Sequence, residues 1–151
     1  MKAVIQAVSS AAVWADGELT GKIGRGMTLL LGVSVNDTEK EAKFLAKKAA
    51  NLRIFKDAED KLNLSVKDIG GGILVVSNFT LCANSEKGNR PSYIEAARPE
   101  QAEPLYELFK KELAGNGVEE IGCGRFGAEM RIMQENDGPT TIILDTDVIM
   151  K

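Results

Sequence analysis

The sequence predicts an α+β fold with a curved, mixed or barrel-like β-sheet and two long helices. Three observations support this prediction. Strand-like segments occur in groups at the start, in the middle and at the end of the chain. Two helix-like segments separate the groups, which argues against a doubly wound parallel sheet. The 151 residues contain no internal repeat and no linker, so we expect a single domain over residues 1–151.

The first group of strands lies within residues 2–35. Residues 2–9 alternate loosely between apolar and polar side chains, which predicts a strand. Asp16-Gly17 lies between two further strand-like runs and favours a tight hairpin turn. The run from Met27 to Val35 is almost wholly apolar and is typical of a strand that is buried on both faces.

An amphipathic helix is predicted after this group. Thr38 and Glu41 are three positions apart and fit a capping box at its start. Apolar side chains then recur at helical spacing as far as Leu52. Lysines occupy the opposite face, where they form either a solvated surface or part of a phosphate-contacting patch. These lysines are Lys40, Lys43 and Lys47.

The middle and final strands are shorter. A polar loop, residues 84–98, precedes a second helix, which begins at Pro99 and stops at Gly115-Asn116-Gly117. Residues 136–139 are predicted to form a turn between the last two strands. The strands expected in these groups are 53–55, 63–66, 73–77, 118–122, 130–135 and 140–145.

The chain contains no histidine, and this restricts its chemistry. Ser-His and Cys-His nucleophilic machinery is excluded. A transition-metal site is disfavoured, because imidazole is the usual ligand. Cys82 and Cys123 are too few for a disulfide framework or a recognisable metal site, and we expect buried or half-buried thiols. We therefore expect neither a metal nor a cofactor.

Charge and hydropathy bear on partners and location. The net charge is -3 and the pI is about 5.1, whereas proteins that hold nucleic acid by charge alone are normally basic. Any contact with nucleic acid must therefore use a local basic patch. No apolar run approaches the ~20 residues that span a bilayer, and polar Gln6 comes too early for a secretion signal. We expect a cytoplasmic protein without a membrane segment.

Two segments combine residue types that suit a ligand site. Ser77-Asn78-Phe79-Thr80-Leu81 ends an apolar strand, where hydroxyl and backbone N–H groups can face a ligand. The alternative is a strand that simply becomes polar at its end. Asn136-Asp137-Gly138-Pro139-Thr140-Thr141 contains a proline, which offers no N–H, so this turn presents acceptors. The alternative is a plain hairpin turn.

Both segments resemble motifs of the D-aminoacyl-tRNA deacylase family, which are written S-Q-F-T-L and N-x-G-P-V-T. The stretch Gly124-Arg125-Phe126-Gly127-Ala128-Glu129-Met130 resembles the family's G-x-F-G-A-x-M. Further similar segments follow the family's order along most of the chain. They are Ala3-Val4-Ile5-Gln6, Leu52-Arg53-Ile54-Phe55, Asn63-Leu64-Ser65-Val66, residues 87–92 and Ala96-Ala97.

The resemblance implies a homodimeric ester hydrolase that proofreads translation by removing D-amino acids from tRNA. Glycine mischarged on tRNA-Ala is a further substrate that it suggests. The Gly138-Pro139 bond would be cis, and this pair, with Asn136 beside it, would enter the partner subunit's pocket. The carbonyls of the pair would face the substrate's α-amino group and leave no room for an L side chain.

The resemblance also implies a catalytic segment, Ser77 to Thr80, that needs no histidine. Backbone N–H groups near Phe79 and Thr80 would hold the ester carbonyl and stabilise developing negative charge, and the terminal 2′-hydroxyl of the tRNA would take part. Thr80 is expected to position the substrate rather than to attack it, because no base is evident beside it. The pocket for the terminal adenosine would be shaped by Phe126, Gly127, Ala128 and Met130. The residues expected to contact tRNA are Lys43, Lys47, Lys87 and Arg90.

Three positions depart from the family's pattern. Asn78 stands where the family usually has Gln, so its hydrogen bond must shift or use water. Thr140 replaces a Val of the motif. Ala7 stands where the family usually has an Arg that is expected to brace the Gly-Pro loop. These departures keep a second hypothesis open, a catalytically weakened homodimeric RNA-binding module of the same fold. A third hypothesis is an unrelated α+β domain that binds a small molecule.

Overall fold

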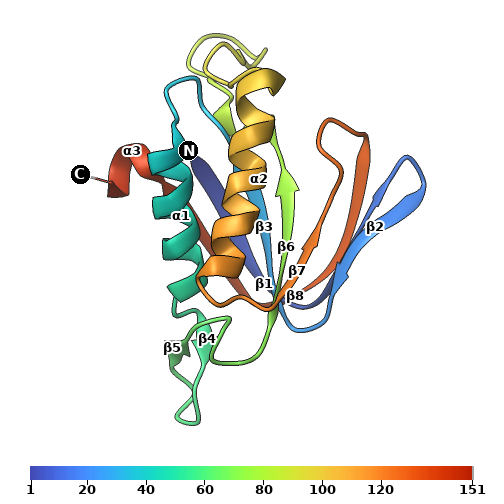
Figure 1. Ribbon diagram of the computed structural model, residues 1–151, viewed down its shortest axis with the longest axis vertical. Coiled ribbons are helices and arrows are strands. Elements are labelled where there is room, and N and C mark those ends of the chain that lie inside the picture. The colour runs from blue at the N-terminus through green and yellow to red at the C-terminus, as the bar shows by residue number, and fades with distance from the viewer. Residues whose placement is uncertain (151) are drawn as a thin grey trace.

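The structure, a computed structural model, describes residues 1–150. It has one curved mixed sheet, a small two-stranded sheet and two long helices that lie on one side of the curved sheet (Figure 1). The strands are β1 (Lys2–Ala15), β2 (Glu18–Ile23), β3 (Gly26–Gly32), β4 (Phe55–Lys56), β5 (Leu62–Leu64), β6 (Gly72–Ser77), β7 (Glu120–Cys123) and β8 (Met130–Asp145). The helices are α1 (Glu39–Asn51), the short 3-10 helix η1 (Phe79–Cys82), α2 (Pro99–Gly115) and α3 (Thr146–Ile149).

The chain begins with a long antiparallel hairpin. β2 and β3 follow one register along the same edge of β1, in which Ala11 pairs with Ile23 and Val8 pairs with Gly26. Asp16 and Gly17 join the two arms with positive φ angles of 51° and 81°, as a tight hairpin turn requires. The predicted hairpin is confirmed, although β1 extends well beyond the strand expected at residues 2–9.

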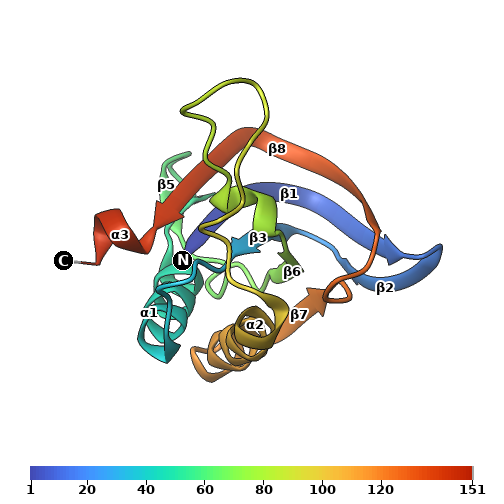
Figure 2. The same ribbon diagram turned by 90° about the horizontal axis from the view of Figure 1, so that it is seen from above.

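The sheet curves until it nearly closes into a barrel. The hydrogen-bonded order of its strands is β2-β1-β3-β6-β7, in which β2 and β3 pair with different stretches of one edge of β1. β8 pairs with the other edge of β1, and β3, β6 and β7 run parallel to one another. At the far end of the sheet β7 lies beside β2. Their closeness is shown at Gly21, where an added Cβ atom would lie only 2.6 Å from the carbonyl oxygen of Cys123. Figure 2 shows this curvature along the barrel. The α+β, barrel-like prediction is confirmed.

Two apolar clusters lie on opposite faces of the sheet. The larger one fills the space between the sheet and helices α1 and α2, with Ile5, Leu29 and Phe109 fully buried in it. The smaller one, which includes Val13 and Leu74, lies inside the barrel. The apolar run that was predicted to be buried on both faces is β3, and it ends at Gly32 rather than at Val35.

The turn predicted at residues 136–139 is wrong. β8 is one continuous strand that pairs with β1 on both sides of this segment, through Val8 with Asn136 and Gln6 with Thr141. Residues 137–140 therefore form a wide bulge opposite the single residue Ala7. The residue types are those of a turn, but continuous pairing with β1 keeps the strand direction unchanged.

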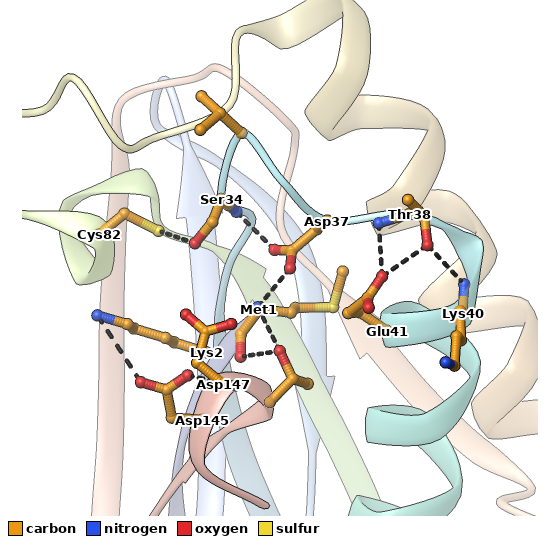
Figure 3. A network of polar contacts seen from close by, with 12 residues as sticks. Met1, Lys2, Ser34, Asp37, Thr38, Lys40, Glu41, Cys82, Asp145 and Asp147 are labelled. Carbon is orange, nitrogen blue, oxygen red and sulfur yellow. Dashed lines mark hydrogen bonds and ion pairs between the residues drawn. The ribbon is translucent and has the colours of Figure 1, made fainter. Parts of the chain in front are cut away.

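A buried polar network closes the start of β1 (Figure 3). The Met1 ammonium lies 2.6 Å from Asp37 Oδ1 and 2.7 Å from Thr146 Oγ1. The Ser34 N–H donates to the other Asp37 oxygen at 2.6 Å, and the Ser34 hydroxyl lies 3.5 Å from the Cys82 thiol. The network thus joins both chain ends to the β3–α1 loop and reaches the end of η1.

The predicted capping box is present at the start of α1. The Thr38 hydroxyl accepts from the Lys40 N–H, and Glu41 accepts from the Thr38 N–H at 2.8 Å. Within residues 1–150 no helix is long and apolar enough to cross a membrane.

Candidate active site

The segment Ser77 to Thr80 lies where buried strand β6 ends. β6 is buried as far as Val76, and Ser77 is half-buried. Ser77 pairs with Leu31, and the Asn78 N–H donates to the Leu31 carbonyl at 2.8 Å. The chain leaves the sheet at this point, so the parallel neighbour β3 fixes where the segment begins.

The 3-10 helix η1 leaves two backbone donors unused. The first N–H groups of a helix have no acceptor within it. Here the turn bonds begin with the Leu81 N–H, which donates to the Asn78 carbonyl at 3.3 Å. The N–H groups of Phe79 and Thr80 therefore have no acceptor within η1, and both residues are exposed. Two adjacent free donors can hold a carbonyl oxygen as it gains negative charge.

The Thr80 side chain is held by Asn78. Its hydroxyl donates a short hydrogen bond to Asn78 Oδ1. An amide oxygen is not a base at neutral pH, so this partner cannot activate the hydroxyl for attack. The contact also gives Asn78 a role that does not require a longer side chain.

An exposed aromatic pair covers one side of η1. Phe79 is 57% exposed, and its ring meets the ring of Tyr93 edge to face, with the ring centroids 5.3 Å apart. Tyr93 belongs to the loop 84–98, which folds back on itself through paired backbone bonds between Asn84 and Ser92. The loop arches away from η1 and returns to α2 (Figure 2). The length of this loop was the only sequence signal for Tyr93.

The segment 124–130 begins at the same edge of the sheet as η1. β7 is the parallel neighbour of β6, and the Gly124 N–H donates to the Val75 carbonyl at 3.1 Å. Because parallel strands end at one edge, the segment that begins at Ser77 and the segment 124–130 leave the sheet side by side. Strand periodicity alone did not predict this neighbourhood.

The Phe126 ring lines a cavity of about 480 Å³ between β2, α2 and the end of β7. It packs against the ring of Tyr106, with the centroids 5.9 Å apart, and the Tyr106 hydroxyl donates to the Val75 carbonyl at 3.2 Å. Burial raises the pKa of Tyr106, so its hydroxyl remains a neutral donor. The cavity also carries Glu103 and Glu107. The sequence alone predicts no role for Tyr106 in this cavity.

The other three residues expected in the adenosine pocket lie elsewhere on the segment. Met130 packs against the barrel cluster and lines a second cavity, of about 660 Å³, with Trp14. Gly127 is exposed with a positive φ of 77°, and Ala128 is half-buried. Neither Gly127 nor Ala128 lines the cavity that contains Phe126.

The bulge of β8 carries Gly138 and Pro139, and the peptide bond between them is cis. Both residues and Asn136 are exposed. Gly138 has a φ of 119°, and a Cβ atom there would lie 2.6 Å from both the backbone nitrogen and Oγ1 of Thr140. Only glycine fits this position without a shift of the bulge.

The bulge and the η1 segment do not meet within one chain. β1 and β3 lie between β8 and β6, so the two segments are separated by roughly 10–15 Å across the sheet. They also lie at different levels, since Ser77 is in register with Leu31 and Ala3, whereas the bulge faces Ala7. No single small group of a ligand can therefore contact both segments of one chain.

The cations expected to contact tRNA lie at the surface. Lys43, Lys47, Lys87 and Arg90 are exposed, and Lys43 forms an ion pair with Glu39 at 3.7 Å. Across residues 1–150, no three Cys, Asp or Glu side chains gather as candidate metal ligands. Cys82 is buried and Cys123 is half-buried, as expected.

The chain matches the family model described as D-Tyr-tRNA(Tyr) deacylase over residues 4–145. It belongs to this family. It is 53% identical over 146 residues to the D-aminoacyl-tRNA deacylase of Akkermansia muciniphila, with 97% of each chain covered. It is 55% identical over 148 residues to that of Roseiflexus castenholzii, with 98% of this chain and 94% of the relative covered.

Two solved structures share the fold of this chain. A protein described as the c-Myc DNA Unwinding Element Binding Protein superposes with a TM-score of 0.90 at 44% identity, covering 96% of this chain and 98% of that one. A probable eukaryotic D-amino acid tRNA deacylase superposes with a TM-score of 0.81 over 95% and 97% of the two chains, and at 16% identity it supports the fold alone. The hypothesis of an unrelated small-molecule-binding domain is therefore wrong.

Proposed function

We propose that this protein hydrolyses the ester bond of D-aminoacyl-tRNA and releases the free D-amino acid and tRNA. Membership of the deacylase family supports this reaction. The observation that carries the proposal is the pair of free N–H groups of Phe79 and Thr80 at the end of β6. These donors suit an ester carbonyl, and the chain offers no histidine for a different acyl-transfer mechanism.

In this mechanism water adds to the ester carbonyl, and its oxygen gains negative charge in front of the two N–H groups. Removing one such donor typically costs ~10²–10³ in rate. The bond to the tRNA 3′-oxygen then breaks, and that oxygen takes up a proton. The neighbouring 2′-hydroxyl of the terminal adenosine relays that proton, because it accepts the proton that the water loses and gives up its own, so no side-chain base is required. Ser77, Asn78 and Thr80 hold the segment and the substrate in place.

Stereospecificity comes from a homodimer in this proposal. The Gly138 and Pro139 carbonyls enter the partner's site, face the α-amino group and leave no room for an L side chain. Two observations support this arrangement. The bulge is exposed on a strand that, within residues 1–150, pairs only with β1, and it lies away from η1 of its own chain. A glycyl ester has no side chain to reject, so glycyl-tRNA is also a substrate.

Contact with tRNA uses exposed cations on α1 and the loop 84–98, in a cytoplasmic protein of net negative charge. Charge reversal of Lys43, Lys47, Lys87 and Arg90 should weaken tRNA binding and flatten its dependence on salt, because fewer counterions are released. Binding constants at several salt concentrations measure this slope. An unchanged slope would exclude these residues as phosphate contacts.

The second candidate is a homodimeric RNA-binding module that has lost most of its activity. Ala7 and Asn78 favour it, because both depart from the family's pattern. Retention of Gly138-Pro139 and of Phe79-Thr80 favours the enzyme.

Hydrolysis of matched D- and L-tyrosyl-tRNA in the presence of EDTA tests the enzyme directly. Rapid loss of the D ester alone would support the deacylase, its stereospecificity and its independence of metal together. If a folded dimer hydrolyses neither ester, the RNA-binding module becomes the better account.

A further inference from the structure

The bulge of β8 receives no side chain from the strand opposite. Residues 137–140 face Ala7, whose methyl group is buried in the cluster under the helices. A Cβ atom added to Gly138 would lie 2.6 Å from Thr140, so the bulge has no room for a side chain at this position. Its orientation relative to β1 must therefore be set at its two ends, Asn136 and Thr141.

A chain of side-chain amides joins these two ends. Gln134 Nε2 donates to Asn136 Oδ1 at 2.7 Å and to Gln6 Oε1 at 2.9 Å. Gln6 Nε2 then donates to Thr141 Oγ1 at 3.3 Å. The chain Asn136–Gln134–Gln6–Thr141 thus spans the mouth of the bulge. We name these four residues the amide clamp.

Within the amide clamp, Gln6 and Gln134 are the two residues that connect the ends of the bulge to β1. Both are half-buried, whereas Asn136 and the residues of the bulge are exposed apart from half-buried Thr140. Gln6 comes from β1, which is held by pairing on both edges, so it gives the clamp a fixed anchor. Gln134 donates one hydrogen bond to this anchor, Gln6, and one to Asn136, and so ties the Asn136 end of the bulge to β1.

We propose that the amide clamp sets the direction of the Gly138 and Pro139 carbonyls, and that Gln6 and Gln134 are therefore positioning residues for stereospecificity. The inference rests on the stereospecific function proposed above. A filter that works by steric rejection needs atoms that do not move, because a small displacement admits an L side chain. Ala7 has no side chain that could hold the bulge, so the clamp is the side-chain contact that supplements the backbone pairing at its two ends.

The test uses Gln134→Met, which keeps the length of the side chain but has no N–H donor, so both bonds from Gln134 are lost. The ratio of kcat/KM for D- and L-tyrosyl-tRNA should fall ~10-fold, as expected for two hydrogen bonds. Thr141→Val loses only the bond from Gln6 and should lower the ratio less. Gln101→Met is the matched control, because Gln101 donates to the carbonyls of Val35 and Asp37 and takes no part in the clamp. It should lower Tm and leave the ratio unchanged.

Amide hydrogen exchange at Asp137, Gly138, Thr140 and Thr141 separates this inference from the proposed function. Exchange should be faster in Gln134→Met than in the wild type, whether or not either ester is hydrolysed. Unchanged exchange would overturn the clamp. Faster exchange with an unchanged D-to-L ratio would overturn its role in stereospecificity. If the wild type hydrolyses neither ester, the proposed function fails, and exchange still decides whether the clamp holds the bulge.

Discussion

The start and the middle of the β1–β8 pair are built in opposite ways. At the start, Met1 and Thr146 are buried, and every polar group there has a partner. In the middle, the bulge at Gly138 and Pro139 is exposed, and only a few side-chain hydrogen bonds tie it to β1. Burial fixes the first region, because an unpaired buried polar group is costly. The second region is accessible to a binding partner, and its geometry depends on few contacts.

The largest effect is expected at the buried start of the pair. Asp37→Ala removes the partner of the Met1 ammonium and leaves that charge buried, since both side chains are almost fully covered. Loss of one member of such a pair typically costs ~3–5 kcal/mol. Denaturant unfolding of the variant and of the wild type measures the change in the free energy of unfolding.

Thr146→Val is the matched comparison, because it removes a neutral partner of the same ammonium and should cost less. A loss below ~1 kcal/mol for Asp37→Ala would mean that burial does not distinguish the two regions as argued.

The next effect tests the exposed bulge. Gly138→Ala places a Cβ atom against Thr140 and requires a φ of 119°, which should cost ~1–3 kcal/mol. Because the carbonyls then move, hydrolysis of D-tyrosyl-tRNA should fall more than ~10-fold, since 1.36 kcal/mol corresponds to a factor of ten. Single-turnover hydrolysis measures the rate.

Gly70→Ala controls for backbone strain alone. Gly70 also has a positive φ, 62°, but a Cβ atom there would meet nothing within 4 Å. Stability should fall while hydrolysis stays at the wild-type rate. Equal losses of activity in the two variants would remove the special role of the bulge.

An intermediate effect is expected at Thr80, which is exposed yet follows a buried strand. Thr80→Val removes the hydroxyl that Asn78 holds, and the backbone N–H groups remain. We expect hydrolysis to fall ~10-fold, as for one lost positioning hydrogen bond. Loss of a covalent nucleophile typically costs ~10⁴ or more. A loss of that size, with an acyl-enzyme trapped by acid quench, would make Thr80 the nucleophile.

Local patterns predicted the elements that local contacts stabilise. Asp16-Gly17 predicted the hairpin because its two residues must adopt positive φ. Thr38 and Glu41 predicted the start of α1 because their bonds lie within one helical turn. In the site, the segment 77–80 was located by its residue types and by family resemblance.

Long-range pairing was not predictable in the same way. Asn136 to Pro139 has the composition of a turn, and only the pairing of β8 with β1 on both sides keeps it within a strand. The Met1–Thr146 contact joins residues 145 positions apart. The clamp between Gln6 and Gln134 spans 128 positions, and nothing in either local sequence marks it.

The smallest effect concerns the capping box, which is adjacent to Asp37 but lies at the surface. Thr38→Ala should cost ~1 kcal/mol of stability, well below Asp37→Ala. The hydrogen bond from Thr38 lowers the pKa of Glu41 in the folded chain. This contribution is therefore present above the unfolded pKa of about 4.3 and is lost as pH falls through the lower folded pKa.

Unfolding of the wild type and of Glu41→Gln at neutral and acidic pH measures the capping contribution. The two proteins should differ at neutral pH and converge in acid. A difference in stability that persists in acid would mean that Glu41 acts through packing rather than through its charge. Glu41 would then no longer serve as the exposed polar group with which buried Asp37 is compared.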